Sequence, residues 1–471
     1  DVCSSDLISV GRISLSFPLN LVVTNVDAAS PHNDTLLSVR RLQVNVQLLP
    51  LLKKQVEVDG ISLQGATVNS NDLIHGMKLN GTLGELFISS HGVALDPETA
   101  IVNKVLLKDT DLSLCLNDTA AADTAASDTT YWKIILQDID LQNVSFALDM
   151  PLDSLSLAAS LDNAILRDGL IDLHKSAYSL QTFRIENGRV RYDNGKPLAA
   201  DSLSSGLDPS HIALTDIGVK LDSLYYGGRN MKAIISQFVL KERSGVEIVS
   251  ATGRMVSNDK VLRVPSLKLE TRDSYLELNA AMDWNALDFK GEGLMSARLM
   301  ADIGKPDVVR FMGRMDEKFV RQYPSEPLRI RTGIDGDLNK LKLTTLTAEL
   351  PGALGLFARG ELTHLTDSLL RGGDITLEAE TKDLKFVSTL AEGIEIPYGT
   401  RLEGKFTMAG TKMGTDLLLM QPEAQAVVAA DTIPITVYND SISVADDFKM
   451  ERAARLFAKY DLSRDRYEDR K

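Results

Sequence analysis

The sequence has very few of the residues that form disulfide, metal or catalytic centres. Its 471 residues include only two cysteines, Cys3 and Cys115, and six histidines. Two cysteines cannot build a disulfide framework, and Cys115 alternates with leucines in DLSLCLND, which is typical of a small strand residue. The histidines show no zinc-ligand spacing, and no serine lies in a nucleophile-elbow context. The sequence therefore predicts a protein without catalytic residues, metal or cofactor, and not an enzyme.

Aromatic residues and positive charge are also scarce. Aromatic residues make up 6% of the chain, only two residues are tryptophan, and the formal net charge is −14. Nucleic-acid binding needs a basic stripe that neutralises phosphates, so this charge argues against a nucleic-acid partner. It also disfavours electrostatic docking on anionic membranes. The sequence contains no apolar run of the ~18 residues that a membrane-spanning helix requires.

What the sequence does contain is a pervasive alternation of apolar and polar residues. Hydrophobic residues make up 44% of the chain and charged residues 25%, as in folded globular proteins. The alternation has period two in runs such as RLQVNVQLL, DIGVKLDSLYY and DITLEAETKDLKF. These runs recur every 8 to 14 residues, roughly, with turn residues between them, which predicts about 25 to 30 strands joined mostly by hairpins.

Three segments of the sequence align without a gap: ISLQGATVNS from Ile61, IDLQNVSFAL from Ile139 and FRIENGRVRY from Phe183. In each segment two apolar residues are five positions apart, an odd step that would place them on opposite faces of a regular strand. A bulge or break restores one face, and Gly or Asn tolerates the left-handed conformation found there. We expect the break at Gly65, Asn143 and Asn187.

Helical patterns are few. QLLPLLKKQ predicts a short helix near residues 47–55, and DIGKPDVVRFMGRM has Pro306 near a helix start. The segment from Val444, with acids early and bases late, predicts a third helix. The expected layout is a first β region over 8–116 with that short helix, a repetitive β region over 131–299, a helical insertion over 300–323, a continuing β region over 328–444 and a charged helical end over 445–471.

A sheet with one apolar face must cover that face. With so many similar strands and so few helices, we predict a mainly β fold: an elongated, curled, mostly antiparallel repetitive sheet that forms an open hydrophobic groove. An exposed apolar lane of this size calls for a ligand, and phospholipid acyl chains fit because each buried methylene gains about 0.8 kcal/mol. The residues predicted to line the groove are Ile61, Leu63, Ile139, Leu141, Phe183, Ile185, Val219, Leu221, Leu276 and Leu278.

Two stretches resemble a known family. ISVGRISLSFPLNLVVTNV, followed by DTLLSVRRLQVNVQLLPLLKKQVEVDGISLQGATVN, is similar to the opening of AsmA-like and TamB-type (translocation and assembly module) envelope proteins. LKLETRDSYLELNAAMDW from Leu267 resembles a later strand pair of TamB-type members. The resemblance extends from Ile8 to about Asp440 and rests on loose hydrophobic patterns.

The resemblance implies a function in the envelope of Gram-negative bacteria. It implies a periplasmic bridge, anchored in the inner membrane, that carries phospholipids to the outer membrane and takes part in outer-membrane biogenesis. An inner-membrane anchor and an outer-membrane β-barrel partner would belong to the full-length protein. The first seven residues, DVCSSDL, look like translated sequencing-adapter read-through, so we expect residues 1–7 to be an artefact and the chain to be an internal fragment.

Two other functions remain open. The edge strand of a long sheet could template outer-membrane protein strands by β-augmentation, which would make the protein an assembly factor for β-barrels. The chain could also be a structural β-solenoid of the cell surface. Co-purified phospholipid would favour the lipid bridge. Cross-links to barrel precursors would favour the assembly factor, and a dry closed core would favour the structural solenoid.

Overall fold

The structure is a computed structural model of the whole chain. It describes residues 7–16, 20–29, 35–46, 58–70, 77–94, 98–117, 131–195, 206–287, 293–313, 316–389, 398–410, 412–420, 431–438, 441–444 and 454–461. These residues are mainly β, as predicted, with a few short helices between strands. The chain forms two units, Asp1–Thr252 and Gly253–Lys471, and the division falls within strand β13 (Glu247–Ser257) rather than at a predicted boundary.

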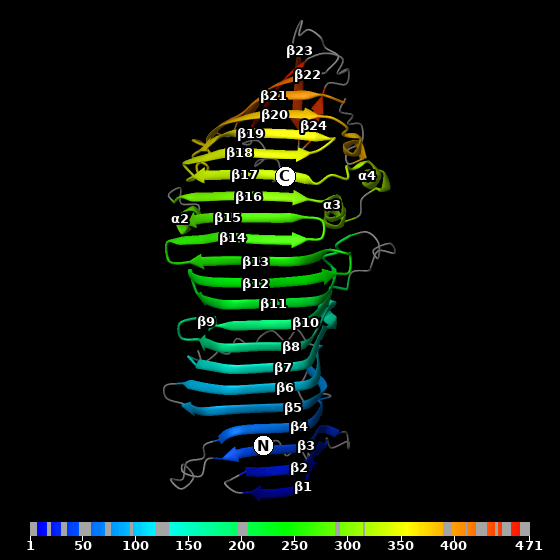
Figure 1. The fold of residues 1–471 in the computed structure, drawn as a ribbon, viewed down its shortest axis with the longest axis vertical. Coiled ribbons are helices and arrows are strands. Elements are labelled where there is room, and N and C mark those ends of the chain that lie inside the picture. Colours follow the sequence, from blue (N-terminus) through cyan, green and yellow to red (C-terminus); the bar gives the residue numbers. More distant parts are fainter. Residues whose placement is uncertain are drawn as a thin grey trace, which may run out of the picture. The chain divides into compact units, whose positions relative to one another are not determined.

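The first unit is a mostly antiparallel sheet whose strands lie beside one another largely in chain order (Figure 1). Its strands are β1 (Leu7–Ser16), β2 (Asn20–Ala29), β3 (Thr35–Val46), β4 (Val58–Asn69), β5 (Met77–Ala94), β6 (Thr99–Leu116), β7 (Lys133–Met150), β8 (Leu155–Asp172), β9 (Ala177–Leu180), β10 (Thr182–Asp193), β11 (His211–Gly227) and β12 (Asn230–Glu242). The short 3-10 helix η1 (Pro151–Asp153) joins β7 to β8.

The strands of the first unit pair in chain order with two irregularities. β6 and β7 are parallel, whereas the other pairs in this unit are antiparallel. β9 and β10 lie end to end along one edge of β8, and both also pair with β11. The alternation of apolar and polar residues in the sequence therefore becomes a single sheet with two chemically different faces.

A line of backbone breaks crosses the first unit from strand to strand. Residues with a left-handed backbone conformation mark it on strands β2, β4, β6, β7, β10 and β11: Asn25 (φ 53°), Gly65 (φ 63°), Asp109 (φ 49°), Asn143 (φ 50°), Asn187 (φ 54°) and Asp216 (φ 52°). This confirms the breaks predicted at Gly65, Asn143 and Asn187. At Gly65 and at Asn143, one residue on each of the two paired strands is unpaired: Arg40 opposite Gly65, and Asp162 opposite Asn143. Both strands therefore skip the same number of residues, unlike a β-bulge, in which one strand has an extra residue. We call this line the crease.

The second unit is also a sheet of strands in chain order (Figure 1). Its strands are β14 (Val261–Thr271), β15 (Tyr275–Asp283), β16 (Met295–Ile303), β17 (Leu328–Gly336), β18 (Lys340–Leu350), β19 (Leu354–Thr363), β20 (Gly372–Thr381), β21 (Arg401–Ala409), β22 (Lys412–Met420), β23 (Asp431–Tyr438), β24 (Ser441–Val444) and β25 (Ala454–Asp461). Neighbouring strands from β14 to β22 are antiparallel, and β25 is antiparallel to β22 and parallel to β23.

The helices of the second unit lie at the ends of its strands. They are α2 (Trp284–Leu287), α3 (Lys305–Met312), α4 (Glu317–Gln322) and the 3-10 helix η2 (Lys385–Thr389). α3 has Pro306 in its first turn, as the sequence predicts for the 302–315 segment. A buried apolar cluster lies here, where Phe319 of α4 and Phe386 of η2 pack over the strand ends at Leu350.

One helix prediction is wrong and another lies outside the described residues. Ala454–Asp461, inside the segment expected to be helical, is strand β25. Its local charge pattern suits a helix, but Leu456, Ala458 and Tyr460 also alternate with period two, and backbone pairing with β22 and β23 selects the extended form. The predicted helix near 47–55 falls on residues that the structure does not describe.

Candidate functional site

The most distinctive feature of the first unit is a pair of apolar rows that run across its strands. In each row the residues are paired in register from β1 to β12, and every strand of the main ladder contributes one apolar residue. The first row is Leu15, Leu21, Val44, Ile61, Ile88, Val105, Ile139, Leu166, Phe183, Leu221 and Ile235. The second row is Ile13, Val23, Leu42, Leu63, Leu86, Leu107, Leu141, Ala164, Ile185, Val219 and Phe238.

The two rows lie on the same face, because on each of the other contributing strands their residues are two positions apart. On β12 the step from Ile235 to Phe238 is three residues, at a register shift in its pairing with β11. We call this the apolar face of the first unit. It contains eight of the ten residues that the sequence predicts for a groove. Ile61, Ile139, Phe183 and Leu221 lie in the first row, and Leu63, Leu141, Ile185 and Val219 lie in the second.

The crease keeps the apolar face continuous across the break. A Cβ atom placed on Gly188 would lie 3.2 Å from Cγ2 of Ile185 and 3.2 Å from Cβ of Ile217, so residues three apart share a face at this point. Val190, two positions beyond Gly188, therefore returns to the apolar face. Without the left-handed residue, every side chain beyond the break would project from the opposite face.

The second unit also has two in-register rows, apolar except for a threonine and a glycine, and they contain the other two predicted residues. Leu276 pairs with Leu269 and Ala301, and Leu278 pairs with Leu267 and Leu299. The first of these rows continues through Ile330, Ala348, Leu356, Ala379 and Leu402. The second continues through Thr332, Leu346, Ala358, Leu377 and Gly404.

The bulky members of these rows are only partly covered. Ile61 is 38% exposed and Ile13 is 66% exposed. Most of the other described members are half-buried, and the buried ones are chiefly small, such as Ala164, Ala301 and Ala358. Aliphatic side chains arranged in register and left partly open to solvent form a surface that gains free energy when an apolar partner covers it.

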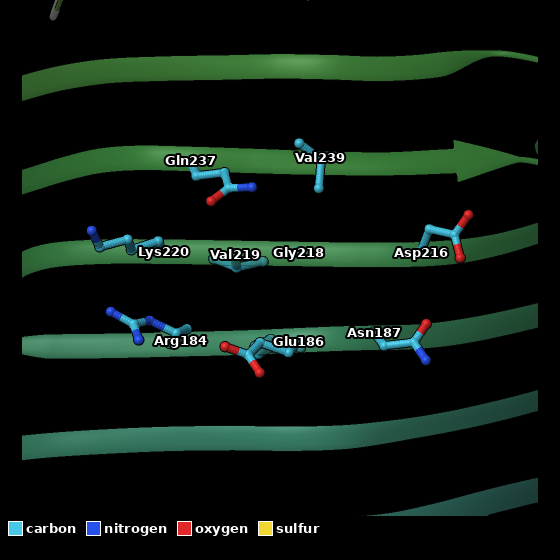
Figure 2. Close-up of a pocket in the computed structure, with 10 residues that line it drawn as sticks. Arg184, Glu186, Asn187, Asp216, Gly218, Val219, Lys220, Gln237 and Val239 are labelled. Carbon is cyan, nitrogen blue, oxygen red and sulfur yellow. The ribbon is translucent and has the colours of Figure 1, made fainter.

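On β10, β11 and β12 the face opposite the apolar rows is mainly polar. Figure 2 shows Arg184, Glu186, Lys220 and Gln237 lying together over β10, β11 and β12, with the crease residues Asn187 and Asp216 beside them. They line an open depression of about 550 Å³. Charges of both signs and the amide groups make this face compatible with water, so the two faces differ in chemistry along the same strands.

The crease is held on the polar face by side-chain hydrogen bonds. Asn143 Nδ2 donates to Asp109 Oδ1 over 2.9 Å, and Ser145 Oγ donates to Asp111 Oδ1 over 2.8 Å. Asn187 Nδ2 donates to Asp162 on the neighbouring strand. These bonds connect neighbouring strands directly at the crease. The acidic residues at the crease are therefore the acceptors that link each strand to its neighbour.

Two other features are absent from the residues that the structure describes. No group of three or more His, Cys, Asp or Glu side chains in the described ranges is placed to hold a metal ion. No helix in the part of the chain that the structure describes is long and apolar enough to cross a membrane.

Sequence reasoning missed most members of the rows. Leu86, Leu107, Val105 and Ile235 have the same place in the face as the predicted residues, yet only the register of long-range strand pairing identifies them. It also missed an exposed group of tyrosines at one edge of the first unit, including Tyr178 and Tyr226, whose rings stack at 6.2 Å. The consecutive tyrosines at 225–226 are the feature of the sequence that could have indicated this group.

Comparison with known proteins adds no family to these observations. No protein-family model matches the chain, and no curated protein matches it.

Proposed function

We propose that this protein binds phospholipid acyl chains on its apolar face and conducts them between the inner and outer membranes of a Gram-negative cell. In this proposal the chain is part of a periplasmic bridge of the AsmA-like or TamB type. The observation that carries the proposal is the pair of in-register apolar rows in the first unit, which pass from strand to strand without a polar residue.

The chemistry of the rows suits an acyl chain that moves along them from strand to strand. Their members are almost all Leu, Ile and Val, so successive strands offer the same aliphatic surface. An acyl chain of about 16 carbons gains on the order of 10 kcal/mol from such a surface, close to what it loses on leaving a bilayer. Transfer along the rows is then nearly level in free energy and requires no catalytic group.

A lipid-capture experiment tests the proposal. The chain is expressed with a periplasmic signal sequence, purified without detergent, and its bound lipids are identified by mass spectrometry. We expect phospholipid in the wild type and much less in Val219→Asp and Leu278→Asp, because a carboxylate on an apolar surface costs several kcal/mol to cover. Lys220→Asp, on the polar face of the same strand as Val219, is the matched control and should retain lipid.

Circular dichroism of each variant separates loss of lipid from loss of fold. A folded wild-type protein free of phospholipid would contradict the proposal. So would equal lipid content in the Val219→Asp, Leu278→Asp and Lys220→Asp variants. Cross-links from the apolar rows to barrel-protein precursors, in place of lipid, would instead support the assembly-factor function.

A further inference from the structure

One edge of the first unit gathers exposed tyrosines together with basic side chains. This edge is formed by the start of β7, the turn between β8 and β9, and the turn between β11 and β12, which lie side by side through the β7–β8, β8–β9 and β9–β11 pairings. In Figure 1 it is the left-hand edge near the label β9. We call it the tyrosine edge and define it by Tyr131, His174, Lys175, Tyr178, Tyr226 and Arg229.

The aromatic rings of the tyrosine edge contact one another and stay open to solvent. Tyr131 and His174 meet edge to face with ring centroids 5.3 Å apart, and Tyr178 stacks on Tyr226. Tyr131 is 52% exposed and Tyr226 is 47% exposed. Together with Tyr225, these residues account for four of the five large exposed tyrosines among the described residues. Such clustering in a chain with 6% aromatic residues marks a surface of distinct chemistry.

The tyrosine edge is continuous with the apolar face. A Cβ atom on Gly169 would lie 2.9 Å from Cδ2 of Leu166, a member of the first apolar row, so Gly169 and Leu166 share a face. Ile171, two positions further along β8, lies on the same face and pairs with Tyr178, which in turn pairs with Tyr226. The two stacked tyrosines therefore lie at the border of the apolar face, near the ends of its strands.

The charge of the edge is positive although the whole chain is acidic. Lys133, Lys175, Arg229 and Lys232 lie at the strand ends here, and all four are exposed. Two carboxylates, Glu98 and Asp172, lie nearby, and each accepts a backbone hydrogen bond. Glu98 Oε2 accepts a hydrogen bond from the N–H of Tyr131 over 3.1 Å, and Asp172 Oδ1 accepts one from the N–H of Lys175 over 3.0 Å.

The opposite edge of the same strands has the opposite charge. Among the described residues it carries Asp149, Asp153, Asp193 and Asp208. His211 lies buried between two of them, with Nδ1 2.8 Å from Asp208 and Nε2 3.6 Å from Asp193, and Arg243 donates to its backbone carbonyl over 3.3 Å. An amphiphile whose tails lie along the strands therefore meets a basic, aromatic edge at one end and an acidic edge at the other.

We propose that the tyrosine edge holds the anionic phosphate headgroup of a phospholipid whose acyl chains lie on the apolar face of the first unit. The inference rests on the proposed function and adds an orientation to it. Tyrosine places an apolar ring against acyl carbons and a hydroxyl at the polar boundary, while lysine and arginine bind phosphate oxygens. The acidic edge would repel the same headgroup, so the bound lipid points in one direction.

A spin-label experiment tests the orientation in the full chain. Both native cysteines are replaced by serine, and a nitroxide is attached at Ser176→Cys in the tyrosine edge or at Ser210→Cys in the acidic edge. The protein is loaded with phosphatidylglycerol and its ³¹P resonance is recorded. We expect strong broadening by the label at position 176 and little by the label at 210. Equal broadening, or stronger broadening from position 210, would overturn the inference.

A charge-reversal experiment tests the chemistry independently. Lys175→Glu combined with Arg229→Glu should weaken retention of phosphatidylglycerol about tenfold relative to diacylglycerol, which has the same tails and no phosphate. Lys220→Glu, on the polar face of β11, is the matched control and should leave the ratio unchanged. An unchanged ratio in the double variant overturns the inference. Absence of both lipids from the wild type would instead count against the proposed function.

Discussion

At the scale of single residues, the fold depends on side chains that tolerate a left-handed backbone. Asn143 and Asp109 occupy this conformation on adjacent strands and also hydrogen-bond each other. The sequence predicts the break at Asn143 because the odd spacing between Leu141 and Phe146 needs one. It does not predict Asp109, since no aligned segment surrounds that residue. Local residue spacing therefore predicts a break where the repeat is clear. Where the repeat is unclear, only the strand pairing in the structure reveals the break.

The first prediction concerns Asn143. Asn143→Val should lower the free energy of unfolding by about 1–2 kcal/mol, because a β-branched residue pays the full steric cost of φ 50°. Asn143→Gly should change it much less, since glycine adopts this conformation freely. Urea unfolding followed by circular dichroism measures the difference. Gln142→Val, the neighbouring exposed residue in the extended ladder, controls for the added valine, and an equal loss there would contradict the role of the crease.

A second residue-scale prediction concerns pH and Asp208. The side-chain hydrogen bond from His211 lowers the pKa of Asp208, and the backbone N–H of Ser210 lowers it further. Because the folded pKa lies below the unfolded value, the carboxylate stabilises the fold above the unfolded pKa of 3.8, and this contribution is lost as the pH falls through the folded pKa. Asp208→Asn should therefore flatten the acid limb of the unfolding curve below about pH 4. An unchanged acid limb would contradict the role of this pair.

At the scale of elements, the alternation of apolar and polar residues predicts the strands. The position of helix α3 depends instead on side-chain hydrogen bonds to a distant turn. Helix α3 is predicted from Pro306 and its apolar spacing, but the residue that fixes it is not. Asp307 is 1% exposed, accepts hydrogen bonds from Ser274 Oγ over 2.6 Å and from Thr271, and pairs with Arg310 over 3.0 Å. Sequence reasoning missed this because Thr271 and Ser274 lie more than thirty positions away from Asp307, at the β14–β15 turn.

The anchor gives a prediction for helix α3. Asp307→Ala leaves the hydroxyl groups of Thr271 and Ser274 without their acceptor, which costs about 1.5–3 kcal/mol for bonds to a charged group. Amide hydrogen exchange should therefore speed up in Lys305–Met312 and in the β14–β15 turn, while β18 and β19 remain protected. Glu317→Ala, at a carboxylate that is 90% exposed, is the control and should leave exchange unchanged. Uniformly faster exchange throughout the second unit would show that Asp307 does not act locally.

At the scale of the whole molecule, the sequence predicts the class of the fold and the chemistry of its face. Period two, scarce helices and few aromatics were enough to predict a mainly β, largely antiparallel chain with an apolar face. They could not predict the parallel β6–β7 pair, because a single sequence carries no record of which strands meet across a long connection. For the same reason the sequence predicts a helix where β25 forms, although the backbone of β25 pairs with β22.

The apolar face of each unit yields a prediction about the protein with and without lipid. A ligand that binds only the folded state stabilises it by RT ln(1 + [L]/Kd), about 2.7 kcal/mol at a hundredfold excess over Kd. Removing bound lipid should therefore lower the midpoint of thermal unfolding and increase binding of a hydrophobic dye, because side chains such as Ile13 and Ile61 become available. Adding phosphatidylglycerol should reverse both changes, whereas a soluble phosphate ester without acyl chains should reverse neither. If the ester alone restored the midpoint, the stabilising contact would be with the headgroup, and the rows of leucine, isoleucine and valine would not be the surface that lipid covers.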